Sequence, residues 1–469
     1  MLFLLAAPGL LAESPWPQFR GPNGSGVAPD AHPPVFFGPA SNVLWTISLP
    51  SGYSSPCVWG ERIFLTGYDG EKLETLCVAR RDGKILWRRT APARQIEAFN
   101  KREGNPAAGT PATDGARVYV YFGSCGLLCY DHNGKEQWQL PLPVAKTVGD
   151  FGSGTSPIVA DGLVILNRDQ ATNSALLAVN ARTGRIAWQS DRPDFFSSWS
   201  TPVIWAQSAK EVVLPGFLRL KSYDLKTGVE RWTVRGLAAA VCTSPVIGDG
   251  LLYCATWSTG GSGGEEASFP PFEMLLLGDK DGDGKISLSE AKAAKMGDFF
   301  NAYDSNKDGF IERQEWDGLR NIALQGKNSL LAIRSGGRGD ITATHVAWTV
   351  TKGLPYVPSP LFYQGRIYLV KDGGMVSCFE AKTGKELFVQ ERLGAPGSYY
   401  ASPVAADGKI FFASLKGVIT VLEAGDTLKV LASNEFGERL GSTPALVGNQ
   451  MFVRTDQHLH AFGASVTKR

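Results

Sequence analysis

The sequence predicts an all-β protein, an eight-bladed β-propeller closed by its N- and C-terminal strands, with a small α-helical insert in the fifth blade. Three observations carry this prediction. A Ser/Thr-Pro dipeptide recurs eight times in one context, with short apolar stretches after each of these copies, and one long interval contains two loops rich in acidic residues. The 54 Gly and 28 Pro fall in turn-like clusters. Such a composition favours many short strands joined by tight turns.

The repeat is defined by the dipeptide and by an aromatic residue that follows a glycine by four positions. Most intervals between dipeptides are 41 to 46 residues, and two are 55 and 115. The dipeptides begin at Ser55, Thr110, Ser156, Thr201, Ser244, Ser359, Ser402 and Thr443. The glycine and aromatic pairs are Gly83/Trp87, Gly134/Trp138, Gly184/Trp188, Gly228/Trp232 and Gly384/Phe388. Four short strands in every 40-odd residues are typical of a propeller blade, and blades five and seven look degenerate.

The last repeat ends near Phe462 with only three strands, so its outer strand must come from elsewhere. We expect Val43–Leu49, which contains Trp45, to supply that strand, because closing the ring removes exposed sheet edges. A seven-bladed alternative would leave one repeat unpaired. Closure predicts that residues 1–50 are essential, whereas residues 1–30 are expected to be dispensable.

The chain divides into five segments on composition and repeats. Residues 1–12 are apolar and typical of the remnant of a signal peptide, with a buried N-terminal strand as the alternative. Residues 13–41 are a lead-in, 42–265 hold blades one to five, 266–326 hold the insert, and 327–469 hold blades five to eight. We therefore expect a secreted or periplasmic protein that is a monomer, with no membrane span.

The sequence of the insert predicts calcium binding. Two twelve-residue loops have the EF-hand pattern, with oxygen ligands at positions 1, 3, 5, 7, 9 and 12 and a glycine at position 6, here Gly284 and Gly309. Two Ca²⁺ sites are predicted. The predicted ligands are Asp279, Asp281, Asp283, Lys285, Ser287 and Glu290 in the first loop, and Asp304, Asn306, Asp308, Phe310, Glu312 and Glu315 in the second.

The context of the loops supports an EF-hand pair. Ile286 and Ile311 both occupy position 8, where paired loops form a short β-bridge. Apolar residues at helical spacing precede the first loop and follow the second, and the short segment between the loops predicts abbreviated helices. The insert falls between two strands of blade five, Leu251–Trp257 and Leu330–Ile333.

Aromatic residues mark the connections between blades, on the face that also carries the insert. They are Tyr53, Phe151, Trp199, Tyr356, Tyr399 and Tyr400. An aromatic rim around a shallow mouth predicts a binding face for a protein or glycan. The alternative is that these rings only pack neighbouring blades together.

The cysteines and histidines give weaker signals. Cys77, Cys129 and Cys378 fall at one strand position that holds Ala or Ser in other blades, so they are expected to be small buried hydrophobes. One local disulfide, Cys242–Cys254, remains an alternative. His458 and His460 share a strand face, but two ligands alone do not make a zinc site.

The Ser/Thr-Pro, Thr-Gly and spaced Trp pattern resembles the pyrroloquinoline-quinone (PQQ) repeat family over residues 42–463 apart from the insert. Trp16–Asn23 is similar to the lead-in of bacterial secreted members. The resemblance implies an eight-bladed propeller but no single activity. Some members are quinone dehydrogenases, and others are non-catalytic scaffolds such as the outer-membrane barrel-assembly lipoprotein.

In those dehydrogenases the quinone lies between a tryptophan and a disulfide of two adjacent cysteines, near a calcium held by the propeller. No two cysteines are adjacent in this chain, and its convincing calcium ligands lie in the insert, so PQQ is not expected. Trp199 could serve as one stacking wall, although its position in the repeat explains it equally well.

The function predicted is that of a non-catalytic, calcium-binding scaffold or binding protein, with no catalytic or cofactor-binding residues. A quinone-dependent dehydrogenase is the alternative. A polysaccharide-active enzyme that uses acids such as Glu103 or Asp150 is less favoured. A net charge of +2 without a basic block argues against nucleic acid as a partner.

Overall fold

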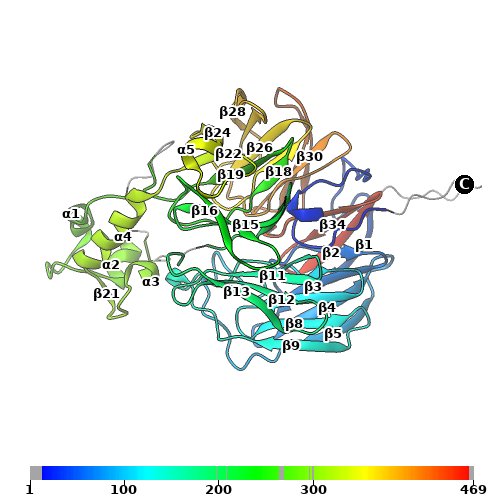
Figure 1. The fold of residues 1–469 in the computed structure, drawn as a ribbon, viewed down its shortest axis with the longest axis horizontal. Coiled ribbons are helices and arrows are strands. Elements are labelled where there is room, and N and C mark those ends of the chain that lie inside the picture. The colour runs from blue at the N-terminus through cyan, green and yellow to red at the C-terminus, as the bar shows by residue number, and fades with distance from the viewer. Residues whose placement is uncertain are drawn as a thin grey trace, which may run out of the picture.

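The computed structural model describes residues 13–463 apart from 197, 208, 263–268, 295, 298 and 299. The predicted signal-peptide remnant, residues 1–12, therefore lies outside the described residues. Eight antiparallel sheets are arranged around a central axis, and a small group of helices projects from one side (Figure 1). The predicted fold class is confirmed.

Each blade has four antiparallel strands, which in blades 1 to 7 follow in chain order from the axis outward; in blade 8 the N-terminal strand forms the outer edge. Blade 1 is β2 (Cys57–Trp59), β3 (Arg62–Tyr68), β4 (Leu73–Ala79) and β5 (Ile85–Thr90). Blade 2 is β6 (Ala112–Thr113), β7 (Arg117–Phe122), β8 (Gly126–Asp131) and β9 (Glu136–Pro141). Blade 3 is β10 (Ile158–Ala160), β11 (Leu163–Arg168), β12 (Ala175–Asn180) and β13 (Ile186–Asp191). Blade 4 is β14 (Val203–Ala206), β15 (Lys210–Gly216), β16 (Arg219–Asp224) and β17 (Glu230–Arg235).

The second half repeats the pattern. Blade 5 is β18 (Val246–Gly248), β19 (Leu251–Thr256), β22 (Ser329–Arg334) and β24 (Val346–Val350). Blade 6 is β25 (Leu361–Tyr363), β26 (Arg366–Lys371), β27 (Met375–Glu380) and β28 (Glu386–Arg392). Blade 7 is β29 (Val404–Ala406), β30 (Lys409–Ser414), β31 (Val418–Glu423) and β32 (Val430–Glu435). Blade 8 is β33 (Ala445–Val447), β34 (Gln450–Arg454), β35 (His458–Gly463) and β1 (Val43–Ser48).

The insert and the connections supply the short helices. In the insert lie α1 (Phe272–Leu275), η3 (Leu276–Gly278), β20 (Ile286–Ser287), α2 (Leu288–Ala293), α3 (Phe300–Tyr303), β21 (Phe310–Ile311) and α4 (Arg313–Gln325). Outside it lie η1 (Pro22–Gly24), η2 (Val148–Asp150), β23 (Gly339–Asp340) and α5 (Thr342–His345). No helix of the described residues is long and apolar enough to cross a membrane.

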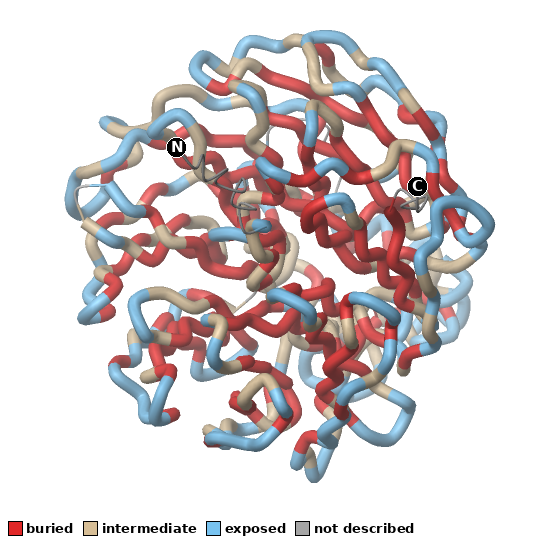
Figure 2. Tube along the Cα trace, turned by 90° about the vertical axis from the view of Figure 1, so that its right-hand side faces the viewer, coloured by how far each residue is buried: buried red, intermediate tan, exposed pale blue. Residues whose placement is uncertain are grey.

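The ring closes as expected, through the N-terminal strand. β1 pairs antiparallel with β35, with Trp45 opposite Ala461 and Thr46 opposite His460. The Thr46 hydroxyl lies 2.9 Å from Nδ1 of His460. The strands near the axis of the propeller are buried, whereas the strands and turns at its outer edge are exposed (Figure 2).

The recurring Ser/Thr-Pro dipeptide has a structural cause. The hydroxyl of each Ser or Thr accepts a hydrogen bond from the amide of the equivalent residue in the preceding blade, and the eighth bond returns to the first blade. The donor and acceptor pairs, at 2.9–3.1 Å, are Ser55/Thr110, Thr110/Ser156, Ser156/Thr201, Thr201/Ser244, Ser244/Ser359, Ser359/Ser402, Ser402/Thr443 and Thr443/Ser55. We call this set the hydroxyl ring. The following proline restricts its neighbour to an extended backbone, which suits the start of an inner strand.

The recurring tryptophan also has a structural role, because it joins one blade to the next. Its indole Nε1 donates to a backbone carbonyl of the next blade at 2.9–3.1 Å. The pairs are Trp45/Arg80, Trp87/His132, Trp138/Ala181, Trp188/Leu225 and Trp348/Ala381. The ring then covers the glycine of the next blade. A Cβ at Gly134, whose φ is +80°, would lie 2.6 Å from Cδ2 of Trp87, so only glycine fits there.

Two details correct the sequence analysis of the repeat. Blade five is not degenerate at its aromatic position, because Trp348 covers Gly384 as the other tryptophans cover their glycines. Trp232 instead donates to Glu211 within its own blade at 2.7 Å. Beyond Trp232, β23 adds a fifth strand to blade 4, parallel to β17.

The small residues at the shared strand position lie opposite these aromatics. Cys77 pairs with Trp87, Cys129 with Trp138, and Cys378 with Phe388. All seven cysteines are free, including Cys242 and Cys254. His458 binds Glu438 through Nδ1 at 2.6 Å. The cysteines at this position therefore pack as small hydrophobes.

The lead-in is an integral part of the propeller, which corrects the expectation that residues 1–30 are dispensable. Trp16 pairs with Val58 of blade 1 and is 1% exposed. Arg20 is fully buried and donates to the carbonyl of Pro360 at 2.6 Å. Asn23 exchanges two side-chain hydrogen bonds with Ile204. The segment thus links blades that are far apart in sequence, and its removal would expose the inner strands.

Candidate functional site

The connections between blades converge on one face and enclose a cavity of about 170 Å³ at the central axis. All eight members of the hydroxyl ring line it. The remaining polar and aromatic lining is Phe19, Tyr53, Glu103, Phe151, Ser153, Trp199, Cys242, Tyr356 and Tyr400. We call this space the axial cavity.

Five of the six aromatic residues singled out in the sequence line the axial cavity: Tyr53, Phe151, Trp199, Tyr356 and Tyr400. Phe151 meets Trp199 edge to face at 5.9 Å, and Nε1 of Trp199 donates to the carbonyl of Gly152 at 2.8 Å. Tyr356 meets Trp257 in the same way at 5.8 Å. Contacts with neighbouring loops thus hold the rings of Phe151, Trp199 and Tyr356 in place, and each of these residues still lines the axial cavity.

Tyr399 is a correction, because it does not belong to this rim. Its side chain is fully buried, and its hydroxyl donates to the carbonyl of Ala395 at 2.7 Å. Its amide donates to Asp372 at 2.9 Å. Neighbouring residues in an extended segment point to opposite sides, so Tyr400 reaches the cavity and Tyr399 enters the core between blades.

Among the described residues that line the axial cavity, Glu103 is the one carboxylate, and none is a Lys or Arg. Burial raises the pKa of its carboxyl, and a hydrogen bond from Tyr400 acts in the opposite direction. Burial also raises the pKa of the Tyr356 phenol well above its usual value, with Cys242 and Glu103 adding to the effect. Among the described lining residues, the one carboxylate thus has no positively charged side chain beside it in the lining.

A second buried acid, Glu97, was not identified from the sequence. It is 2% exposed, and Oε2 accepts from the hydroxyl of Ser153 at 2.7 Å and from its amide at 3.2 Å. Burial raises the pKa of Glu97 to about 7. Ser153 also lines the axial cavity, so Glu97 supports the wall from behind. Its loop has no counterpart in the other repeats, which left no pattern to point to it.

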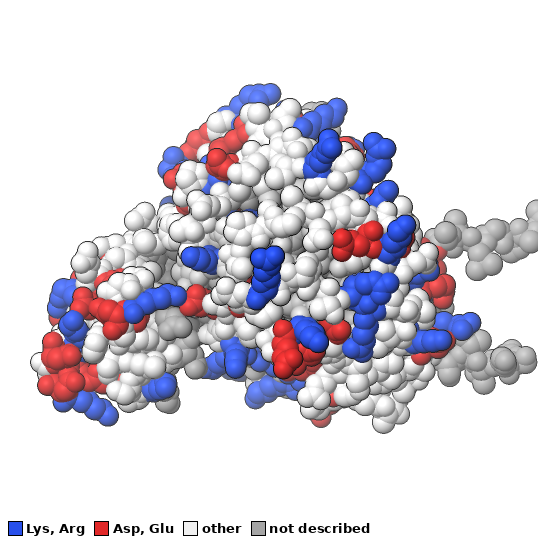
Figure 3. All heavy atoms as spheres, turned by 90° about the horizontal axis from the view of Figure 1, so that it is seen from below, with Lys and Arg blue, Asp and Glu red and all other residues white. Residues whose placement is uncertain are grey.

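The first EF-hand loop brings its acidic residues together. One carboxylate oxygen from each of Asp279, Asp281 and Asp283 lies within 4.8 Å of the others. Asp279 accepts from the amides of Gly282 and Gly284, at 2.7 and 3.0 Å. Glu290, the third residue of α2, forms a capping box with the N-cap residue Ser287, the predicted ligand at position 9. Figure 3 shows acidic side chains gathered at the end of the insert.

The second loop repeats this arrangement. Asp304 accepts from the amides of Asp308 and Gly309, at 3.2 and 3.0 Å. Glu315 accepts from the amides of Ser305 and Asn306 at 2.8 and 3.0 Å, so its carboxylate already faces the start of the loop.

The two loops are joined to each other. Ile286 pairs with Ile311, and Ser287 with Phe310, in a two-stranded sheet. The side chain of Lys285 forms an ion pair with Glu312 and lies over the Phe310 ring at 5.3 Å. The structure therefore gives Glu312 a bridging contact in addition to its predicted place at position 9.

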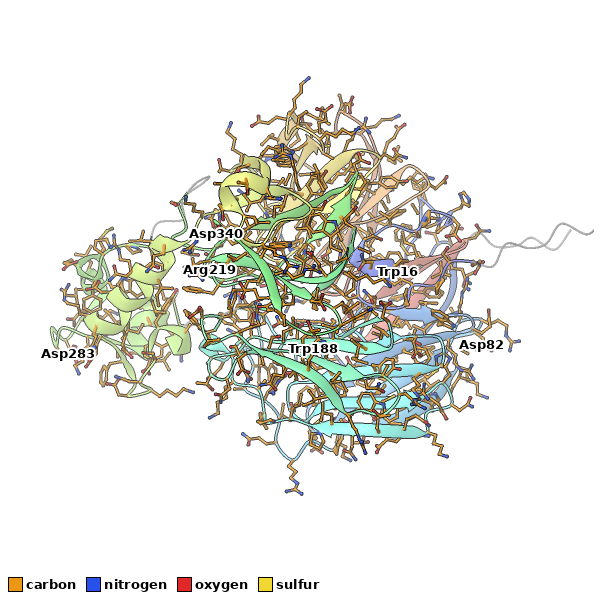
Figure 4. All side chains as sticks on the ribbon, viewed as in Figure 1. Trp16, Asp82, Trp188, Arg219, Asp283 and Asp340 are labelled. Carbon is orange, nitrogen blue, oxygen red and sulfur yellow. The ribbon has the colours of Figure 1, made fainter. Side chains whose placement is uncertain are left out.

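The insert contacts the rim of the axial cavity through its second loop. Ala302 of α3 packs against Gly149 of η2, where a Cβ would lie 2.7 Å away. Lys307 pairs with Asp150 at 3.4 Å. Phe151, the next residue, lines the cavity. Asp283 of the first loop lies at the far end of the insert, away from the propeller (Figure 4). The second loop is thus the one next to the cavity.

Comparison with known proteins decides the family. A sequence profile described as "Outer membrane protein assembly factor BamB" matches residues 74–235 and 302–462, more than half of the chain. The chain belongs to this family. An EF-hand profile matches residues 275–292, which contain the first loop. No curated protein matches the chain.

Solved structures share the fold of this BamB-family chain at low identity. BamB from Moraxella catarrhalis is 14% identical, with a TM-score of 0.57 over 91% of this chain and 98% of that one. A europium-containing methanol dehydrogenase is 11% identical, with a TM-score of 0.60 over 96% and 98%. Quinohemoprotein alcohol dehydrogenase from Comamonas testosteroni is 12% identical, with a TM-score of 0.58 over 97% and 81%. These likenesses show the fold alone.

Proposed function

We propose that this BamB-family propeller is an exported, non-catalytic binding protein that holds its ligand or partner at the axial cavity and binds two Ca²⁺ in its insert. One observation carries the binding role. Loops from blades that are distant in sequence bring five aromatic side chains and one carboxylate around a single cavity. Concave, largely apolar sites with a few polar groups are the usual places for ligands.

The calcium part rests on the donor set. Each loop supplies hard oxygen ligands at the EF-hand spacing, and Gly284 and Gly309 adopt the positive φ that the sharp turn needs, +80° and +94°. Asp279 to Glu290 would hold the first ion, and Asp304 to Glu315 the second. A bound ion would neutralise carboxylates that otherwise repel one another, and so would hold each loop in its folded form.

A quinone cofactor fits the axial cavity poorly. PQQ carries several carboxylates, whereas the described lining offers one carboxylate and no Lys or Arg. The seven cysteines are free, and none is adjacent to another in sequence. We therefore derive no redox step for this chain, although two of the solved structures with its fold are dehydrogenases.

Calorimetry tests the calcium part. We expect two Ca²⁺ per chain, with Kd values in the range of extracellular modules, about 0.1–1 mM. Glu290→Gln and Glu315→Gln should each remove one site, and Glu136→Gln, an exposed blade-2 substitution, should remove none. Absence of calcium heat at millimolar metal would contradict the proposal.

Ligand and quinone titrations test the binding role. We expect compounds that enter the axial cavity to change the fluorescence of wild-type protein and not of Trp199→Phe. Reconstitution with PQQ and calcium should leave the quinone unbound and no dye reduced with alcohols or sugars. Stoichiometric quinone binding with dye reduction would replace this proposal with the dehydrogenase alternative.

A further inference from the structure

The axial cavity combines aromatic walls with a single negative charge. Tyr53, Trp199, Tyr356 and Tyr400 line it, as does Glu103. Among the described lining residues, none carries a positive charge that could neutralise Glu103 from within the cavity. Rings around one carboxylate form a recognisable chemical environment, since both attract cations.

We propose that the axial cavity binds an organic cation, a substituted ammonium group, with Glu103 as its counter-ion and the aromatic side chains as its walls. This inference rests on the proposed function, because it assigns the ligand class of the same cavity. A cation near the faces of Trp or Tyr is stabilised by the ring quadrupole. A methylated ammonium suits such a site because it has an apolar surface and needs few hydrogen-bond partners.

The size of the cavity agrees with a small head group. Its volume of about 170 Å³ is below the about 300–1,000 Å³ of sites that enclose drug-sized ligands. The ligand is therefore a small amine or the charged end of a longer molecule. The hydroxyl ring at the same cavity can accept hydrogen bonds from an ammonium that is not fully methylated.

Charges of both signs lie just outside the lining of the axial cavity. Arg439 already stacks over the Tyr53 ring at 5.4 Å and donates to the carbonyl of Arg102 at 2.7 Å, so it is held beside the cavity rather than within its lining. Asp372 acts on Glu103 and Tyr400. Asp456 acts on Tyr53. The contact between Arg439 and the Tyr53 ring shows that a cation can already lie against one of these aromatic side chains.

The proposal also implies a pH dependence. The groups that face Glu103 are Tyr400, Arg102, Arg439 and Asp372. Burial raises the pKa of Glu103, so protonation removes the counter-ion at a higher pH than for an exposed glutamate. Cation affinity should therefore fall as the pH drops through the raised pKa.

The test uses the full-length protein and calorimetry with choline and its neutral isostere, 3,3-dimethylbutan-1-ol. We expect choline to bind at least about tenfold more tightly than the isostere, which corresponds to a cation–π and counter-ion advantage of about 1.4 kcal/mol. Glu103→Gln should lower choline affinity about tenfold or more. The control Glu136→Gln, on the exposed outer edge of blade 2, should leave it unchanged.

The outcomes separate this inference from the proposed function. Equal binding of choline and the isostere, or choline binding that ignores Glu103→Gln in a variant of unchanged melting temperature, would overturn the cation assignment. If choline and tetramethylammonium fail to bind while the neutral sugar cellobiose quenches Trp199, the binding role stands and the cation assignment is wrong. If none of these probes binds, both are overturned.

Discussion

The propeller body and the insert are stabilised in opposite ways. In the body, each blade is held to the next by a hydroxyl-ring bond, and the tryptophan contacts recur in five blades. The insert has one small core, with Phe272, Ile286, Ile311 and Trp316 among its buried members, and two loops made of mutually repelling carboxylates. Repetition distributes stability over many equivalent contacts, whereas the insert has only a few contacts and, under the proposed function, would also depend on bound calcium.

Deleting a segment from each region should give the largest difference between the propeller body and the insert. Deleting residues 1–50 removes β1 and the lead-in, which should expose the edge of β35 and abolish cooperative unfolding. Replacing residues 259–327 with a short Gly-Ser turn should leave the body intact, because Thr256 and Ser329 are already paired. Calorimetric scans of both variants decide this. A cooperative, monomeric 51–469 chain would contradict the closure mechanism.

Truncating one tryptophan in each region should give the next largest effect. Trp138→Ala removes a side chain that is 9% exposed and its hydrogen bond to Ala181, so the body should lose about 3–5 kcal/mol of unfolding free energy. Trp316→Ala should weaken calcium binding and leave the main urea transition unchanged. A main transition that shifts equally in both variants would show that body and insert unfold as one unit.

The unfolding free energy of the propeller body should depend on pH through Glu97. In the folded chain the pKa of Glu97 is raised to about 7, above its unfolded value of 4.5, so stability is lost as the pH rises between these values. Glu97→Gln should therefore raise the unfolding free energy at pH 8 by up to about 3 kcal/mol and change little at pH 4. Urea unfolding at both pH values measures this. Equal effects at both pH values would point to packing rather than ionisation.

A single member of the hydroxyl ring should matter moderately. Ser156→Ala leaves the buried amide of Thr110 without its acceptor, at a cost of about 1–3 kcal/mol. Ser156→Thr keeps the hydroxyl and should cost much less, because Thr occupies the equivalent position at Thr110, Thr201 and Thr443. Denaturant midpoints of the two variants provide the comparison, and equal losses would deny the hydroxyl its role.

Calcium itself should change the body least. Binding to the folded insert stabilises it by about 2.7 kcal/mol at a calcium concentration of 100 Kd. The main transition of the body should move by less than about 0.5 kcal/mol, in wild type and in Glu315→Gln alike. Hydrogen exchange reports the two regions separately. Calcium protection that extends into β19 and β22 would show that the insert and blade 5 are coupled.

Sequence reasoning predicted what the repeats determine. The blade number, the closing strand and the position of the insert follow from spacing, and the Ile286–Ile311 bridge follows from matching loop positions. These features are local, or they recur, so one strand pattern is supported by its equivalents in other blades.

The features that sequence reasoning missed depend on contacts between segments without a repeat. Glu97 lies in a connection unique to its blade, and Arg20 of the lead-in donates to Pro360, which directly precedes blade 6. Trp348 was overlooked because Thr344 stands where the usual glycine precedes the aromatic. The pair Tyr399 and Tyr400 gave no sign of which ring would reach the cavity, because that depends on the exact path of one connection.

The hydroxyl ring has no first or last member. Each amide donates to the hydroxyl of the following blade, and the bond from Thr443 to Ser55 is equivalent to the others. A chain whose old ends were joined by a linker and opened anew between any two blades would keep all eight bonds. The seam in blade 8 is therefore only one of eight places where such a polypeptide could start, and circular permutation is a change this architecture can absorb.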